Sequence, residues 1–161
     1  MKQLILLLII AMLTLAGCYN EASNEGSAHD HFMGDIREAT VSIEVLPTFL
    51  DEVHENIVSV YERVPHHQDV LEYIPCYCGC GDTVGHRDVY ACFINEHSGD
   101  DSVVWDDHGM KCGVCLETAH YSMQMSEAGV STMEIRQYID ESYKEGFAPP
   151  TKTPMPTYIK E

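Results

Sequence analysis

Apolar side chains recur at three- and four-residue spacing through the first half of the chain, which is the period of one helix face. Over 46–64 these positions are Leu46, Phe49, Leu50, Val53, Ile57, Val60, Tyr61 and Val64. Pro47 is acceptable in the first turn of a helix, and Pro65 closes the segment because proline cannot continue one. The pattern therefore predicts a helix over 46–64 and a short second helix over 66–73, which Pro75 stops.

The second half of the chain again shows a helical pattern. Residues 86–95 predict a short helix with one apolar side, and an acidic, glycine-containing loop follows over 97–109. A longer helix is expected over 112–128, because Gly129 is a common residue just beyond a helix end.

A capping-box pattern opens the last predicted helix. In Ser131-Thr132-Met133-Glu134 the serine and glutamate side chains can each satisfy a backbone N–H of the first turn, and Gly146 supplies the C-terminal stop. The alternation of apolar and polar positions that is typical of half-buried strands is almost absent. The sequence thus predicts an all-α fold: a small helical domain with one long irregular, cysteine-rich loop.

Both ends of the chain differ in composition from this middle part. Residues 1–17 have the positive start and apolar run of a signal peptide, and 18–39 are rich in Ser, Asn, Gly, Asp, Glu and His, as in a flexible tether. Residues 148–161 are proline-rich and predict an extended tail. The folded domain is therefore expected over 40–147.

The end of the apolar run carries a processing signal. Leu15-Ala16-Gly17-Cys18 resembles a bacterial lipobox, which implies cleavage before Cys18 and a thioether-linked diacylglycerol on its sulfur. The run is also too short to span a bilayer comfortably. We therefore expect a lipid-anchored domain on the extracytoplasmic face of the cell membrane; an uncleaved anchor helix is the alternative.

The charge balance limits the partners of this domain. The chain has 9 Lys and Arg against 26 Asp and Glu, a formal net charge of −17 at pH 7. No basic stripe is present to neutralise phosphates, which excludes nucleic acid. The acidity also keeps the domain away from anionic lipid, so the Cys18 lipid is the expected membrane contact.

Most of the cysteines are grouped in two short motifs. Cys76, Cys78 and Cys80 form a Cys-x-Cys-x-Cys loop, and Cys112 and Cys115 form a Cys-x-x-Cys pair at a predicted helix start. Unpaired backbone N–H groups at a helix start stabilise thiolates. A Cys-x-Cys disulfide closes almost no loop and is strained, so the crowding favours metal ligation over a disulfide scaffold.

Copper(I) suits this set of thiols better than zinc. Zinc takes four ligands in a tetrahedral site, and five clustered cysteines exceed those positions. Copper(I) accepts two or three thiolates and shares them between ions, which suits an odd, closely spaced set. His86, then His108, are the histidine candidates, and Cys92 is either a ligand or a buried packing thiol. A zinc site, with a histidine replacing one sulfur, stays the alternative.

The expected role is sequestration of the metal or its delivery to another exported metalloprotein, without catalysis. An enzymatic alternative is a thiol–disulfide oxidoreductase with Cys112 as nucleophile and Cys115 as resolving thiol, although no βαβ pattern surrounds the motif. A third interpretation is an interaction module stapled by disulfides or zinc. Neither a phosphate-binding glycine loop nor the spacing of a calcium loop is present in the sequence.

The motifs together resemble a known family. Residues 75–81 read Pro-Cys-Tyr-Cys-Gly-Cys-Gly, and Gly85-His86, Cys92-Phe93 and Cys112-Gly113-Val114-Cys115 follow. The set is similar to the PCYCGC-motif lipoproteins of bacteria, from about residue 46 to the final helix. The resemblance implies lipidation and an exported domain built around thiols. It implies neither a substrate nor a metal, because that family has no assigned function.

Overall fold

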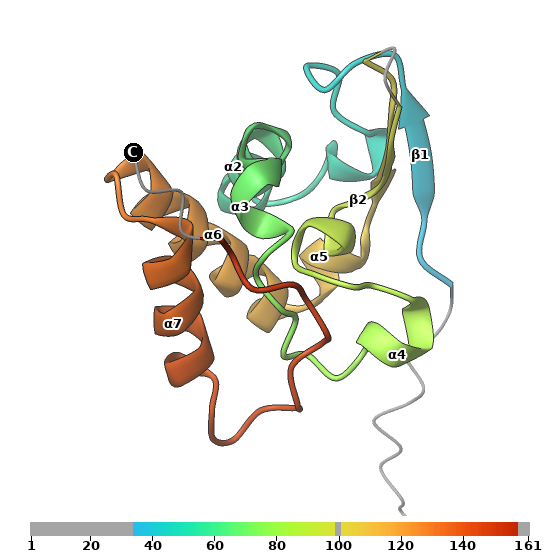
Figure 1. Ribbon diagram of the computed structural model, residues 1–161. Coiled ribbons are helices and arrows are strands. Elements are labelled where there is room, and N and C mark those ends of the chain that lie inside the picture. Colours follow the sequence, from blue (N-terminus) through green and yellow to red (C-terminus); the bar gives the residue numbers. More distant parts are fainter. Residues whose placement is uncertain (1–33, 99–100, 158–161) are drawn as a thin grey trace, which may run out of the picture. The chain divides into compact units, whose positions relative to one another are not determined.

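Helices make up most of the regular structure in the computed structural model, which describes residues 34–98 and 101–157 (Figure 1). The predicted signal peptide, Cys18 and most of the expected tether lie outside the described residues. With η marking 3-10 helices, the elements in chain order are β1 (Arg37–Thr40), η1 (Thr48–Leu50), α2 (Glu55–Arg63), η2 (Val64–His67), α3 (Gln68–Leu71), α4 (Gly81–Val84), η3 (Tyr90–Cys92), β2 (Ile94–His97), β3 (Val103–Asp106), α5 (His108–Lys111), α6 (Gly113–Glu127) and α7 (Thr132–Ser142).

A small antiparallel sheet accompanies the helices, so the prediction of an all-α fold was wrong on this point. Its strand order is β1-β3-β2, with Arg37 opposite Asp106 at one end of the first pair. Each strand has only four residues, so each face shows two positions and no alternation can be recognised. The middle strand β3 is also buried along most of its length, which removes the apolar–polar pattern altogether.

The predicted helix over 46–64 is divided in two. The 3-10 helix η1 and the α-helix α2 are separated by a turn, because the His54 side chain accepts a hydrogen bond from the Asn56 N–H at 3.2 Å and so caps α2. The predicted helix over 86–95 is likewise replaced by η3 and the start of β2, and the expected loop over 97–109 contains β3.

The last two helices agree with the sequence prediction. α6 begins just after Cys112, and Gly129 beyond its end has a φ of 81°. The predicted capping box opens α7, since the Ser131 hydroxyl accepts the Glu134 N–H and the Glu134 carboxylate accepts the Ser131 N–H.

An aromatic group joins the sheet to the helices. The Tyr61 ring of α2 packs edge-on against Phe93, with 5.0 Å between ring centroids, and lies 6.1 Å from the Trp105 ring of β3. The Tyr61 hydroxyl donates a hydrogen bond of 2.8 Å to the Asp106 carbonyl and accepts one of 3.2 Å from the Met110 N–H. These contacts fix the end of β3 and α5, the turn that carries His108.

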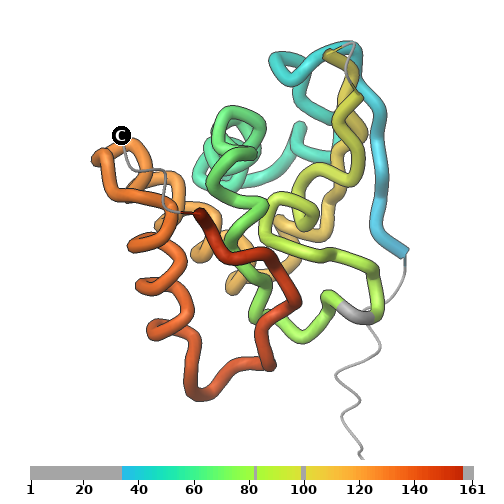
Figure 2. Tube along the Cα trace, in the orientation of Figure 1, coloured from blue at the N-terminus to red at the C-terminus, as the bar shows by residue number. Residues whose placement is uncertain are grey.

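The segment after α7 lies against the cysteine loop. Residues 148–157 contain no helix or strand, and in Figure 2 they form the dark red part of the tube beside the green segment that carries the motif. The Thr151 N–H donates to the Cys76 carbonyl at 3.1 Å, and the Thr151 hydroxyl accepts the Cys76 N–H at 2.8 Å. Arg136 of α7 donates to the Thr153 hydroxyl at 2.7 Å.

The chain before residue 40 also contributes to the fold. Three of the four residues of β1 precede that boundary, and the Asp35 carboxylate contacts the His108 ring. The folded domain therefore includes residues from the segment that the composition assigned to a tether.

Candidate metal centre

The cysteine loop is shaped by a proline, two glycines and the tail. Pro75 follows the turn after α3, and Gly79 has a φ of 82°, a conformation that glycine adopts without strain. At Gly81, the first residue of α4, an added Cβ would collide with the Thr151 side chain. The loop is therefore held between the helices and the tail, with Cys76 buried and Cys78 and Cys80 half-buried.

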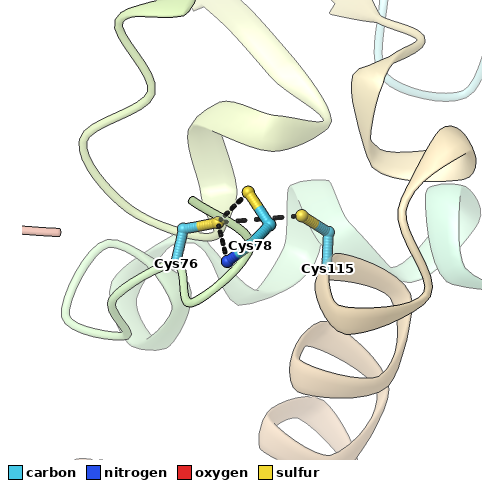
Figure 3. A group of neighbouring side chains, drawn as sticks. All are labelled: Cys76, Cys78 and Cys115. Atoms are coloured by element: carbon cyan, nitrogen blue, oxygen red, sulfur yellow. Dashed lines mark hydrogen bonds between the residues drawn. The ribbon is translucent and has the colours of Figure 1, made fainter. Parts of the chain in front are cut away.

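All six cysteines within the described residues carry free thiols, and four of their sulfurs form a continuous row. The Cys76 Sγ lies 2.9 Å from that of Cys78 and 3.8 Å from that of Cys115, and the Cys115 Sγ lies 3.6 Å from that of Cys92. Figure 3 shows the first three converging, two from the motif loop and Cys115 from the first turn of α6. Residues 39 positions apart thus meet at one place.

One group of potential ligands consists only of sulfur. The Sγ atoms of Cys76, Cys78 and Cys115 all lie within 4.8 Å of one another. Cys76 is 2% exposed and Cys115 is 1% exposed, whereas Cys78 is half-buried. Three converging sulfurs, two of them shielded from solvent, form a ligand set for a soft metal ion.

A second group combines two sulfurs with an imidazole. The ligand atoms of Cys78, Cys80 and His108 also lie within 4.8 Å of one another. The Nδ1 of His108 lies 3.2 Å from both carboxylate oxygens of Asp35, while its buried Nε2 has no hydrogen-bond partner. In a metal-binding histidine, one ring nitrogen usually hydrogen-bonds to a carboxylate and the other binds the metal. His108 has this arrangement, with Nε2 as the nitrogen available for a metal.

The thiols of this centre differ widely in acidity. Hydrogen bonds from the thiols of Cys112 and Cys115 lower the pKa of Cys78 to about 5, so that its sulfur is a thiolate at neutral pH. Burial, followed by the negative charge on Cys78, raises the pKa of Cys80 to about 12. Hydrogen bonds to Cys112 and the neighbouring sulfurs likewise raise the pKa of Cys115. Without a cation, negative charge is thus favoured on Cys78 over Cys80 and Cys115, and a bound metal would help to deprotonate these two.

Cys92 and Cys112 border the two groups. Cys92 is fully buried on η3, its thiol donates to the Asp88 carbonyl at 3.6 Å, and hydrogen bonds from Cys115 and Cys76 lower its pKa to about 7. Cys112 occupies the N-cap of α6, with its thiol beside that of Cys78. The structure thus gathers all six candidate cysteines around one region.

The two candidate histidines occupy different positions. His108, the second choice from sequence, lies with the sulfurs, whereas His86 packs its ring against His108 with 4.6 Å between centroids. The Nε2 of His86 lies 3.6 Å from the Asp106 carboxylate, and Asp35, His86 and Asp106 form a third group of potential ligands. Burial raises the pKa of Asp106, but the nearby His86 imidazole, together with hydrogen bonds from the His108 N–H and Arg37, outweighs this effect and holds the pKa of Asp106 low.

Sequence reasoning missed the carboxylates behind the histidines. Asp35 lies 73 positions before His108 in a polar segment without any periodicity, so no local signal marked it. Asp106 ends the four-residue strand β3, which was itself not recognised. The apolar run Val103-Val104-Trp105 was the available signal for that strand, inside a segment that otherwise reads as acidic loop.

Comparison with known proteins identifies the family of this chain but assigns no function to it. No curated protein and no solved structure matches this chain. A family model described as "Protein of unknown function with PCYCGC motif" matches residues 6–156, which include every cysteine of the centre as well as Asp35 and Thr151. The chain therefore belongs to the PCYCGC-motif family of proteins of unknown function.

Proposed function

We propose that this protein binds a soft metal ion, copper(I), through its clustered thiolates, and sequesters it or delivers it to another exported protein. The single observation that carries the proposal is the convergence of the Cys76, Cys78 and Cys115 sulfurs within 4.8 Å of one another, between the motif loop and α6. A protein of this size needs no such crowding of thiols for its core, which is already built from aromatic and aliphatic side chains.

The ligand types favour copper(I) over zinc. Thiolates select copper(I) and zinc among the common metals, but a zinc site closes with four ligands in a tetrahedron. The all-sulfur group offers three, of which Cys76 and Cys115 are buried and Cys78 is half-buried, and three ligands suit the low coordination numbers of copper(I). Zinc bound to Cys78, Cys80 and His108 with one further ligand is the alternative that metal analysis must distinguish.

The proposed place of action is the extracytoplasmic face of the cell membrane. This rests on the lipobox-like sequence before Cys18, which lies outside the described residues. Among residues 34–98 and 101–157, no helix combines the length and apolar character needed to cross a membrane. The Cys18 lipid would then tether the metal-binding domain near exported proteins that use the metal, and the acidic surface would keep it from nucleic acid.

The test is metal analysis and thiol counting on one sample. The full chain is purified in detergent without oxygen, loaded with copper(I), and freed of weakly bound metal on a desalting column. Bound copper in stoichiometric amount that protects the thiols from alkylation is the expected result. Three disulfides with no bound copper or zinc would refute metal handling and favour the stapled interaction module.

A thiol–disulfide oxidoreductase is the second candidate, and one observation favours it. The thiols of Cys112 and Cys115 lie close enough at the start of α6 to interact. Cys112 could therefore attack a partner protein's disulfide and Cys115 resolve the mixed disulfide, which oxidises these two thiols to a disulfide and reduces the partner's disulfide to two thiols. Disulfide reductase activity that is lost in both Cys112→Ser and Cys115→Ser, in protein free of metal, would support this alternative. Unchanged activity in those variants would exclude it.

A further inference from the structure

The two groups of metal ligands share one residue. Cys78 belongs both to the group with Cys76 and Cys115 and to the group with Cys80 and His108. No group among the described residues unites all five ligand atoms within the same 4.8 Å. One ion therefore cannot contact all five, whereas two neighbouring ions could each contact three.

Cys78 is suited to lie between two ions. A thiolate sulfur has one covalent bond to Cβ and three lone pairs, so it can bind two metal ions at once. The Cys78 sulfur lies 2.9 Å from the Cys76 sulfur and accepts the Cys80 backbone N–H at 3.3 Å. In the folded chain it is within 4.8 Å of the ligand atoms of both groups.

The two positions differ in their surroundings. The inner position has three sulfurs, and the tail covers it through the two Thr151 hydrogen bonds to Cys76. The outer position has the half-buried Cys80 and the His108 imidazole, which Asp35 orients. Asp35 also contacts the Lys111 ammonium at 3.6 Å, so that its carboxylate is held from two sides.

We propose that the centre holds two copper(I) ions with the Cys78 thiolate as the bridge, and that copper is exchanged through the outer, Cys80–His108 position. This inference rests on the proposed function, since it specifies how many ions the same centre takes and which one is transferable. The inner ion, with three sulfur ligands of which two are buried, is the retained one. The outer ion, with the shared Cys78 sulfur, the half-buried Cys80 and the His108 imidazole, is the one passed to or taken from a partner.

The experiment is an anaerobic titration of the full chain in detergent with copper(I) against a chromogenic copper(I) chelator. The wild-type chain is expected to bind two ions in two steps of different affinity. His108→Ala should keep the tight step and lose the weak one, and Asp35→Asn should weaken only the second step by about tenfold to a hundredfold. Cys78→Ser should impair both steps, unlike any other single variant. His120→Ala, on the exposed side of α6, is the matched histidine control and should leave both steps unchanged.

Folding of each variant is checked by circular dichroism, and a second measurement does not depend on any variant. X-ray absorption of the wild-type chain should show copper–copper scattering at two equivalents of copper, because a shared thiolate holds the ions close. A single bound ion, or two ions without that scattering, would overturn the bridged pair while leaving copper binding intact. No bound copper at all would instead refute the proposed function.

Discussion

Replacing Thr151 by valine tests whether the tail is part of the metal centre. Its hydroxyl accepts the Cys76 N–H at 2.8 Å, and its own N–H donates to the Cys76 carbonyl at 3.1 Å. Valine keeps the shape and the second bond but removes the first. Because Cys76 is 2% exposed, water cannot replace the lost acceptor, and an unsatisfied buried N–H costs about 1–3 kcal/mol.

The expected result is a less stable apoprotein. In a domain of this size 1 kcal/mol corresponds to about 4 °C in melting temperature, so Thr151→Val should lower it by about 4–12 °C. The measurement is thermal and urea unfolding of the metal-free, fully reduced chain, with an unchanged urea m-value as the sign that both variants unfold alike.

Thr151→Ser is the matched control for this prediction. Serine keeps the hydroxyl and loses only one methyl group, which costs about 0.8 kcal/mol if fully buried. If Thr151→Val proves as stable as Thr151→Ser, the hydroxyl does not support the loop and the argument that the tail holds the cysteine motif is refuted.

Three further changes test other parts of the fold. Gly109→Ala should destabilise by about 1–3 kcal/mol in urea unfolding, because its Cβ would collide with the Phe93 ring, whereas Gly113→Ala, with open space, should be neutral or stabilising; equal effects would contradict this. Ser131→Ala should cost about 1 kcal/mol by removing the capping box of α7, and an unchanged melting temperature would contradict that role. Hydrogen bonds from the Thr48 N–H and hydroxyl hold the pKa of Glu38 below its ordinary value, so its contribution is present at neutral pH and is lost as the pH falls through that lowered pKa. Glu38→Gln should therefore be less stable than the wild type at pH 7 and equal to it in acid; a gap that persists in acid would contradict the assignment.

The parts of this fold with long, regular signals could be predicted from the sequence. α6 and α7 each have helical spacing together with a glycine stop or a capping box, and both were confirmed to within about one residue at the predicted starts. The sheet could not be predicted in the same way, because four-residue strands are shorter than any pattern that identifies a strand.

The candidate metal centre likewise has one part that the sequence predicts and one part that it does not. The gathering of the two cysteine motifs was expected from their composition and spacing, and the structure brings the Cys76 and Cys115 sulfurs to 3.8 Å. The position of His108 beside Cys78 and Cys80, and of Asp35 behind it, depends on how β1 and β3 pair. Pairing between segments so far apart has no trace in the local sequence, so only the folded structure reveals it.

The hydrogen bonds of Thr151 and Asp35 also determine when the metal centre can form during folding. Asp35 reaches His108 across 73 positions and Thr151 reaches Cys76 across 75, so the centre is assembled from near both ends of the described residues. Closing such long loops is slow compared with helix formation, so the cysteine motif would complete its binding geometry late in folding. If the chain is exported unfolded, as the proposed location implies, the site would form in the same compartment in which it captures its metal.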